Sequence, residues 1–290
     1  MIVIKGVIDM GTNSMRLAVA EVEDGKLTML GQKVLYPRMG EGMGDERRIH
    51  ALPLERNAEA AKELLIQGHS WGAENIRLTA TSAVREAVNK EEVCRYMEEK
   101  TGVKVEVLSG EQEAQLSYNG ASEDFLQEDR TLAVLDIGGG STELVYQSEG
   151  KLCRASVPVG AVVLTEERLT WTEAEELLLD LVKEPLPENI LLVGVGGTHT
   201  CLAAIEQKLK EYDSQRVHGF QLEKNRVAYW LELLQSLPTE ERLNIDGLTP
   251  QRADILPAGV QIVLRMMELL QQEEITISDK GLVYGLLLEA

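Results

Sequence analysis

The sequence predicts an α/β protein of two domains with the same plan. At 290 residues the chain is long enough for two domains of ordinary size, each with its own hydrophobic core. Residues 8–17 and 135–144 share one design: an apolar run ends in Asp, glycine and small polar residues follow, and a second apolar run begins. Such a repeat indicates an internal duplication in which each copy opens one domain. We place the domains at residues 1–125 and 126–290.

The second copy of this design is a glycine-rich turn. In order, its residues are Asp136, Ile137, Gly138, Gly139, Gly140, Ser141, Thr142 and Glu143. Because glycine lets backbone amides approach a phosphate without an intervening Cβ, we expect a β-hairpin whose tip binds an anion. The alternative is a plain glycine-rich turn. The carboxylates on both sides of the turn, together with the first copy, favour anion binding.

The first copy repeats the pattern with more polar side chains. In order, its residues are Asp9, Met10, Gly11, Thr12, Asn13, Ser14, Met15 and Arg16. With the second copy it predicts a phosphate held between the two domains. A third glycine-rich turn, over residues 193–198, follows an apolar run and precedes a helical pattern. Such a strand-to-helix turn can serve a phosphate or nucleotide, so Gly196, Gly197 and Thr198 are candidates for the nucleotide side.

The remaining elements follow from hydrophobic period and turn residues. In the first domain we expect strands over 3–9, 17–22, 26–36, 76–79 and 103–108, with a turn at 23–25 and helices over 54–67 and 111–121. In the second we expect strands over 131–135, 143–147, 151–157, 190–195 and 275–277. Helical patterns cover 165–182, 198–209, 223–234, 238–243, 249–270 and 282–289. Pro185 and Pro187 should break the first of these.

Residues 38–44 form a glycine-rich segment between two predicted elements. We expect it to be mobile. It is either an ordinary surface loop or a cover for the site, and the residues do not choose between these. Gly40, Gly42 and Gly44 supply the conformational freedom that either role would use.

Arg85 opens a predicted helix directly after a strand, where an α/β sheet normally presents ligands. A guanidinium there could hold phosphate oxygens in a bidentate fork. The alternative is an ion pair with Glu86 or another neighbour. The phosphate-type hairpins favour the functional role.

Two glutamates fill the first turn of the predicted helix 111–121. Acidic residues in a first turn routinely complement the helix dipole, so Glu111 and Glu113 need no further role. They lie about 200° apart around a helix, so at most one can face a given site. Periodicity alone does not choose between them.

Composition excludes several classes of protein. The formal net charge is −19, which argues against non-specific binding of nucleic acid or an anionic membrane. A phosphate site in such a chain calls for a local cationic patch or a divalent metal. Three widely spaced cysteines indicate a reducing compartment. We find no signal peptide and no apolar span of about 20 residues, and therefore expect a cytoplasmic protein.

Taken together, the segments resemble the exopolyphosphatase and guanosine pentaphosphate phosphohydrolase family (Ppx/GppA). The resemblance covers nearly the whole chain and rests on residues 9–17, 79–87, 108–114 and 136–143, with further agreement at 158–161, 194–198 and 252–259. It implies two ribonuclease H-like (actin-like ATPase) domains flanking an interdomain cleft, as in the superfamily of acetate kinase, sugar kinases, Hsp70 and actin.

The resemblance also implies site roles. Glu113 matches the family's catalytic base, although Gln112 departs from the usual glutamate beside it. Asp136 and Glu143 match the family's other acidic site positions, which we assign to binding Mg2+ (or Mn2+) and to positioning water. The chemistry of the reaction calls for a divalent metal held by Asp136 with Glu143 or Asp9. The phosphate-binding positions are Thr12, Asn13, Ser14 and Arg16 in the first copy and Gly138, Gly139, Gly140 and Ser141 in the second, with Arg85 as a catalytic cation.

The implied activity is hydrolysis of a terminal phosphoryl group of inorganic polyphosphate or guanosine pentaphosphate. The chain ends at Ala290 without the C-terminal helical domain of longer members, so we expect short polyphosphate or the nucleotide as substrate. A superfamily kinase or ATPase is one alternative, and a non-catalytic alarmone or polyphosphate sensor is another. We also expect a homodimer, because two-fold association is common.

Overall fold

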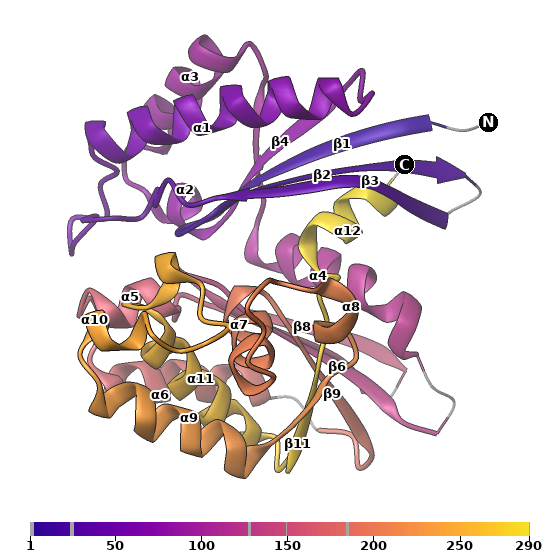
Figure 1. Ribbon diagram of the computed structural model, residues 1–290, viewed down its shortest axis with the longest axis vertical. Coiled ribbons are helices and arrows are strands. Elements are labelled where there is room, and N and C mark those ends of the chain that lie inside the picture. The colour runs from indigo at the N-terminus through magenta and orange to yellow at the C-terminus, as the bar shows by residue number, and fades with distance from the viewer. Residues whose placement is uncertain (1–2, 24–25, 127–128, 149, 184–185, 290) are drawn as a thin grey trace. The chain divides into compact units, whose positions relative to one another are not determined.

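The computed structural model describes residues 3–23, 26–126, 129–148, 150–183 and 186–289 (Figure 1). Packing divides the chain into two units. The first contains Met1–Gly120 and Leu282–Ala290, and the second contains Ala121–Gly281. The turn expected at residues 24 and 25 and the helix break expected at Pro185 lie outside the described residues.

The first unit is a five-stranded mixed sheet with helices on both faces. The strand order is β3-β2-β1-β4-β5, in which β1 to β3 are antiparallel neighbours and β4 and β5 run parallel to β1. The strands are β1 (Val3–Met10), β2 (Met15–Glu23), β3 (Lys26–Leu35), β4 (Ile76–Ala80) and β5 (Val105–Val107). The helices are α1 (Ala51–Ser70), α2 (Ser82–Glu86), α3 (Lys90–Thr101), α4 (Gly110–Phe125) and α12 (Leu282–Leu288).

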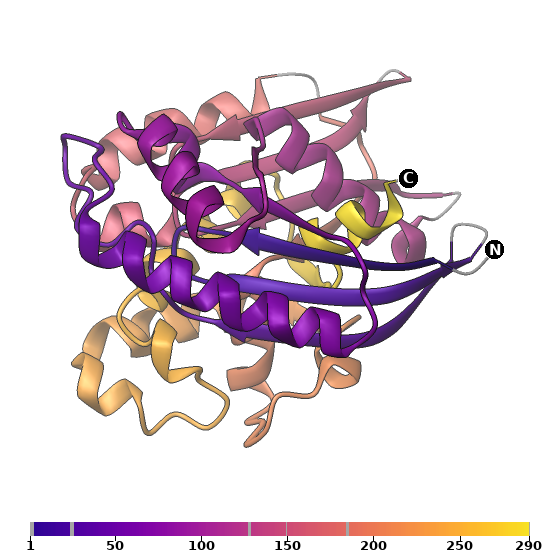
Figure 2. The same cartoon turned by 90° about the horizontal axis from the view of Figure 1, so that it is seen from above.

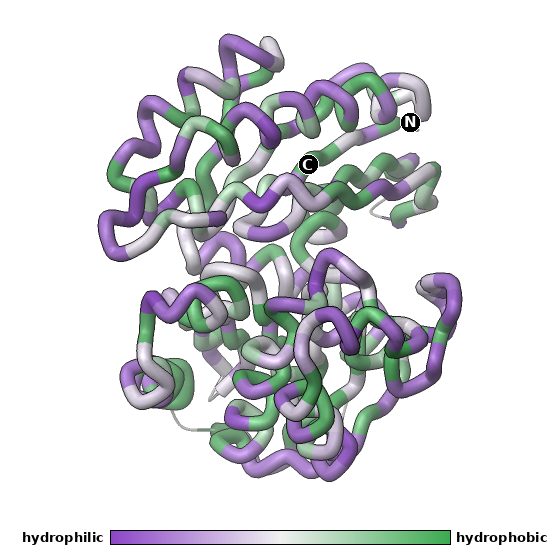
Figure 3. Tube along the Cα trace, turned by 60° about the vertical axis from the view of Figure 1, so that its left-hand side comes forward, coloured by the Kyte–Doolittle hydropathy of each residue, from purple (hydrophilic) through white to green (hydrophobic). Residues whose placement is uncertain are grey.

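Alternate residues of β1 pack on opposite faces of this sheet, as a period of two requires. Ile8 belongs to the core beneath α1 and α3, whereas Val7 belongs to a second core that contains α12 residues. Figure 2 shows α1, in dark purple, running along the indigo strands. In Figure 3, hydrophilic and apolar residues alternate along the helices, as expected for helices with one buried face.

The second unit repeats this plan with one added strand. Its sheet order is β10-β11-β9-β6-β7-β8. Read from β8, the first five strands match β3-β2-β1-β4-β5 in order and direction, and β10 is an additional antiparallel edge. The strands are β6 (Thr131–Ile137), β7 (Thr142–Ser148), β8 (Lys151–Val157), β9 (Ile190–Val195), β10 (Gln221–Glu223) and β11 (Glu274–Ile277). The duplication predicted from the two hairpins is therefore present in the topology.

The helices of the second unit surround a single large core. They are α5 (Ala161–Thr165), α6 (Trp171–Leu179), α7 (Gly197–Glu206), α8 (Ser214–Val217), α9 (Lys224–Ser236), α10 (Thr239–Arg242) and α11 (Leu256–Leu269), with 3-10 turns at Asp180–Val182 and Pro250–Arg252. Among the described residues, no helix combines the length and the hydropathy that crossing a bilayer requires.

Two long helical predictions are corrected. The pattern over 165–182 becomes helical only at Trp171, where α6 begins and continues into a 3-10 turn, because Thr170 and Glu173 form a capping box that starts a new helix after α5 has ended at Thr165. The pattern over 249–270 becomes α helix only at Leu256, where Pro257 stands in the first turn. Helix α3 was not expected, since only Val93 and Met97 of its residues are buried.

The C-terminal helix also differs from the predicted division of the chain. We assigned residues 282–289 to the second domain, but α12 packs in the first unit. Val283 and Leu287 share a core with Val7 and Ala18, and Lys5 donates hydrogen bonds to the carbonyl of Leu287 at 3.2 Å. The change between units near the middle of the chain falls within α4, after Gly120.

Candidate functional site

The turn between β1 and β2 forms the first phosphate-type hairpin. The N–H of Gly11 donates to the carbonyl of Ser14 at 3.0 Å, which closes the turn. Thr12 and Asn13 lie at the tip, each 4% exposed. The Nδ2 of Asn13 is buried and has no hydrogen-bond partner in the described part of the chain. An unpaired buried donor is costly, so this amide suits an acceptor such as a phosphate oxygen.

The glycine-rich loop over residues 38–44 is anchored to this hairpin. The N–H of Arg38 donates to Asn13 O at 3.1 Å, and that of Gly40 donates to Thr12 O at 2.9 Å. Met39 and Met43 are buried in the core of the first unit. The expectation of a mobile loop is therefore wrong, because its two apolar side chains and its backbone hydrogen bonds fix it.

Glu113 and Glu111, which the sequence left undecided, have different environments. Glu113 is 7% exposed, whereas Glu111 is exposed to solvent. The start of α4 is fixed by a reciprocal cap, in which Gln112 N donates to Ser109 Oγ at 3.2 Å and Ser109 N donates to Gln112 Oε1 at 2.8 Å. Gln112 therefore has a capping role.

Arg85 lies beside Glu113. Its Nη1 donates to Glu113 Oε2 at 2.7 Å and to the carbonyl of Leu108 at 3.2 Å. Its Nε lies 3.4 Å from Glu86 Oε1, so the ion pair that we gave as the alternative is also present. Both side chains are largely buried, so the guanidinium fixes the position of the Glu113 carboxylate. The structure thus joins two residues that the sequence suggested separately.

The turn between β6 and β7 forms the second hairpin. The N–H of Gly138 donates to Ser141 O at 3.0 Å, in the position of the Gly11 to Ser14 bond. The start of α5 covers the tip, since Val162 N donates to Gly139 O at 2.8 Å. A Cβ on Gly160 would lie 2.5 Å from backbone atoms of Gly139, so this close approach requires glycine.

Asp136 and Glu143 stand directly opposite each other on β6 and β7. Residues opposite each other in an antiparallel pair point to the same face, and like charges there are destabilising without a counter-ion. Glu143 is 1% exposed, and its Oε1 accepts a hydrogen bond from Ser156 Oγ at 2.8 Å. Two carboxylates on one face fit a divalent cation that keeps several waters, as Mg2+ does.

Asp9, the third predicted metal residue, belongs to the first unit. On β1 it stands opposite Arg16. Among the described residues, no group of three or more His, Cys, Asp or Glu side chains is arranged to hold a metal ion. Within the second unit, the carboxylates that could hold a divalent cation are Asp136 and Glu143, which face each other on neighbouring strands.

The third glycine-rich turn adjoins Asp136. Gly196 has φ 88°, and a Cβ there would lie 2.6 Å from Asp136 Oδ1. The guanidinium of Arg252 lies directly against Gly197, so that a Cβ at this position would overlap it. Thr198 is buried against Gly259 of α11.

Arg252 is a candidate site residue that the sequence analysis missed. It brings a cation beside the Gly196–Gly197 turn, at the start of α7. The only signal was its place in the segment 252–259, where the family resemblance continued but no phosphate pattern was visible.

His199 follows this turn but is part of the core. It is fully buried, and its Nδ1 donates to the carbonyl of Val195 at 2.6 Å. Burial lowers its pKa to about 4. His199 is therefore neutral near pH 7 and has a structural role.

The chain is similar to several proteins of known name. The chain is 29% identical to the bifunctional 3-dehydroquinate synthase/phosphatase of Fusobacterium nucleatum subsp. nucleatum, over 97% of this chain and 46% of that protein. It is 30% identical to exopolyphosphatase 2 of Mycobacterium tuberculosis, over 97% of this chain and 96% of that protein. It is also 30% identical to the guanosine-5'-triphosphate,3'-diphosphate pyrophosphatase of Aeromonas salmonicida, over 97% of this chain and 58% of that protein. The chain thus spans about half the length of two of these relatives.

A solved structure gives the same result at the level of fold. The Aquifex aeolicus PPX-GPPA enzyme superposes with a TM-score of 0.79 at 31% identity, and each chain is fully covered. The predicted fold class, two α/β units of the ribonuclease H-like (actin-like ATPase) type, is confirmed. The model of the Ppx/GppA phosphatase family matches residues 18–290. The chain therefore belongs to the Ppx/GppA phosphatase family.

Proposed function

We propose that the protein hydrolyses a terminal phosphoanhydride bond and releases orthophosphate from inorganic polyphosphate or guanosine pentaphosphate. Membership of the Ppx/GppA family supports this class of reaction. The names of the mycobacterial and Aeromonas relatives supply the two candidate substrates. The observation that carries the proposal is the buried Glu113 carboxylate paired with Arg85 at 2.7 Å.

In the proposed reaction a water oxygen attacks the terminal phosphorus while the bridging P–O bond breaks. Glu113 accepts the proton of that water, and the shortened chain or nucleotide leaves with the bridging oxygen. Such reactions pass through a loose transition state, so catalysis depends on placing the water and neutralising the phosphoryl oxygens. Arg85 holds Glu113 in position and supplies positive charge beside it.

Mg2+ or Mn2+ is the proposed cofactor. Asp136 and Glu143 would hold it, and it would neutralise charge on the phosphoryl oxygens when bound. Ser156 orients Glu143 through the 2.8 Å hydrogen bond to Oε1. In a chain with net charge −19, this charge compensation lets a polyanion bind.

The hairpin tips are the proposed phosphate-binding elements. In the first unit Asn13 offers its buried Nδ2, and Thr12, Ser14 and Arg16 add hydroxyl and cationic donors. In the second unit the backbone of Gly138, Gly139 and Gly140 and the hydroxyl of Ser141 have the composition of an anion-binding nest.

The test is phosphate release from short polyphosphate, long polyphosphate, guanosine pentaphosphate and ATP in the presence of Mg2+. We expect one of the first three to be the best substrate. Glu113→Gln should lower the rate by roughly 10²- to 10⁴-fold, because it removes the base but keeps the shape. Glu111→Gln is the matched control, since it makes the same change at an exposed position of the same helical turn.

Equal rates in the two variants would remove Glu113 from the mechanism. Phosphate transfer from ATP that depends on an acceptor would instead identify a kinase. Tight binding of guanosine pentaphosphate or polyphosphate without turnover in wild type, unchanged in Glu113→Gln, would identify a sensor.

A further inference from the structure

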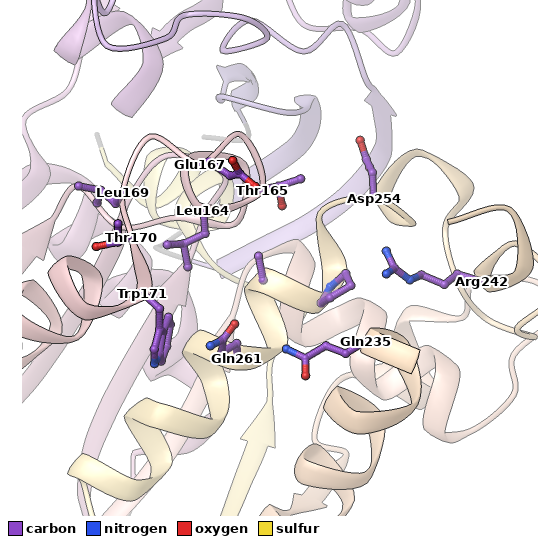
Figure 4. Close-up of a pocket in the computed structure, with 12 residues that line it drawn as sticks. Leu164, Thr165, Glu167, Leu169, Thr170, Trp171, Gln235, Arg242, Asp254 and Gln261 are labelled. Carbon is purple, nitrogen blue, oxygen red and sulfur yellow. The ribbon is translucent and has the colours of Figure 1, made fainter. Parts of the chain in front are cut away.

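A separate pocket lies within the second unit, among α5, α6, α9, α10 and α11 (Figure 4). Its volume is about 560 Å³, which is within the range of small-molecule sites. No residue of the candidate site lines it. We call it the α5–α11 pocket, and its main lining residues are Leu164, Trp171, Gln235, Arg242, Pro257 and Gln261.

Several polar groups of the pocket have unused hydrogen-bonding capacity. The side chains of Gln235, Gln261 and Trp171 make no hydrogen bond within the described part of the chain. Figure 4 shows the amide of Gln235 directed toward Gln261. Arg242 uses Nε for Leu234 O at 2.7 Å and Nη1 for Ala253 O at 2.9 Å, which leaves Nη2 available.

The charges of the lining select against polyanions. Arg242 is accompanied by the carboxylates of Glu167 and Asp254. Burial lowers the pKa of Arg242, whereas Asp254 and Glu240 raise it. A highly charged phosphate would meet more negative than positive side chains here. A neutral ligand with polar edges fits this lining better.

An aromatic surface beside two amides has a recognisable chemistry. Trp171 is half-buried and offers a π surface to a planar ring. A glutamine amide presents a donor and an acceptor side by side, which can pair with the donor and acceptor edge of a heterocycle. We propose that the α5–α11 pocket binds a neutral nucleobase or nucleoside, and that its occupancy is coupled to the candidate phosphate site.

The coupling follows from the walls of the pocket. Helix α5 contributes Leu164 to the lining, and its first turn donates to the second hairpin through Val162 N and Gly139 O at 2.8 Å. Helix α11 contributes Gln261, and two residues earlier in the same helix a Cβ on Gly259 would lie 2.7 Å from Thr198 Oγ1. Two walls of the pocket therefore contact the backbone or side chains of the candidate site.

The third connection is the segment before α11. Arg242 Nη1 bonds the carbonyl of Ala253 from the pocket side. The preceding residue, Arg252, lies against Gly197, and the neighbouring Gly196 lies beside the carboxylate of Asp136. A ligand that engages Arg242 would therefore act on the position of Arg252.

Binding is tested by calorimetry with adenosine, guanosine, cytidine and uridine, and with spermidine and orthophosphate as charged comparisons. We expect one nucleoside to bind, and Gln261→Met to weaken it about tenfold through loss of paired hydrogen bonds. Gln215→Met, on exposed α8, is the matched control and should leave the affinity unchanged. Ligand-dependent fluorescence should also be lost in Trp171→Phe, while Trp71 and Trp230 remain.

Three results would overturn the site: no nucleoside binding at millimolar concentration, binding that Gln261→Met does not weaken, or preference for spermidine or orthophosphate. The coupling, but not the binding, rests on the proposed function. We expect the nucleoside to change the rate of phosphate release at least twofold in wild type and in Gln215→Met. At the same nucleoside concentration the rate of Gln261→Met should not change, because this variant binds the nucleoside more weakly. Nucleoside binding without any phosphate release would contradict the proposed function alone, and release unaffected by the bound nucleoside would contradict the coupling alone.

Discussion

The two hairpins have the same backbone but different charges. Gly11 and Gly138 close their turns with the same 3.0 Å hydrogen bond, three residues along the chain. Asp9 and Asp136 occupy the same position before each turn. Opposite them stand Arg16 in the first hairpin and Glu143 in the second. The two hairpins therefore share the backbone of the tip, whereas the residue opposite the aspartate is a cation in the first and a second carboxylate in the other.

The largest effect should come from removing the charge that distinguishes the second hairpin. Glu143→Gln keeps the side-chain size and its place beside Ser156. We expect phosphate release to fall by roughly 10³-fold and the Mg2+ concentration for half-maximal rate to rise, because metal charge compensation is worth several kcal/mol. Glu274→Gln, on an exposed position of β11, is the control. An unchanged Mg2+ requirement would mean that Glu143 holds no metal.

The units should also differ in their response to acid. His199 is the third residue of α7, a place that Val84 occupies in α2. Since burial lowers the His199 pKa to about 4 from 6.5, its neutral form is favoured in the folded state. Stability is then fully present above pH 6.5 and decreases as the pH falls toward 4, by about 3 kcal/mol in total.

Urea unfolding between pH 4.5 and 7.5 measures this slope. His199→Met should flatten it, whatever its effect on stability at pH 7. His218, whose pKa burial also lowers, remains in both proteins as a common background. Equal slopes in wild type and His199→Met would show that protonation of His199 is not linked to unfolding.

A substitution in the first hairpin should lower activity less than Glu143→Gln does, and it should leave the Mg2+ requirement unchanged. Arg16→Gln removes the cation opposite Asp9. We expect kcat/KM to fall by roughly 10- to 100-fold, as for loss of a charge-assisted hydrogen bond, with no change in the Mg2+ requirement. Arg95→Gln, exposed on α3, controls for net charge. If Arg16→Gln also raised the Mg2+ concentration needed for half-maximal rate, the proposed difference in function between the two hairpins would be contradicted.

The smallest predicted effect is on stability, and it comes from the glycine that packs against the tip of each hairpin. A Cβ on Gly160 would meet backbone atoms of Gly139, whereas a Cβ on Gly40 would meet the Cγ2 of Thr12. Gly160→Ala should cost about 2 kcal/mol of unfolding free energy, and Gly40→Ala about 1 kcal/mol, because a side chain moves more easily than backbone.

Thermal unfolding of both variants measures the difference. Thr12→Ser removes the Cγ2 and should restore most of the stability lost in Gly40→Ala. No single substitution at Gly139 offers such relief for Gly160→Ala. Equal losses in the two glycine variants, or no rescue by Thr12→Ser, would contradict this account.

Features formed by residues that are neighbours in the sequence could be predicted. Features that depend on which residues the tertiary fold buries or brings together could not. Both hairpins are visible because carboxylates, glycines and hydroxyls lie side by side in the chain. The choice between Glu111 and Glu113 needed the burial of one face of α4. Arg252 reaches Gly197 only through the tertiary fold, from a segment without any phosphate pattern.

The anchored loop shows what could have been found. Its glycines suggested mobility, but Met39 and Met43 alternate with them and are apolar residues that need burial. Weighing these two side chains against the three glycines would have predicted an ordered loop. The position of α12 had no comparable signal, because an apolar helix does not specify which sheet it covers.

The place of α12 has a consequence for biosynthesis. Its residues complete a core that contains Val7 and Ala18 from the start of the chain. A ribosome must therefore translate the whole second unit before the first unit can bury this face. The N-terminal sheet emerges first but is completed last, so its apolar surface is a natural target for chaperones during synthesis.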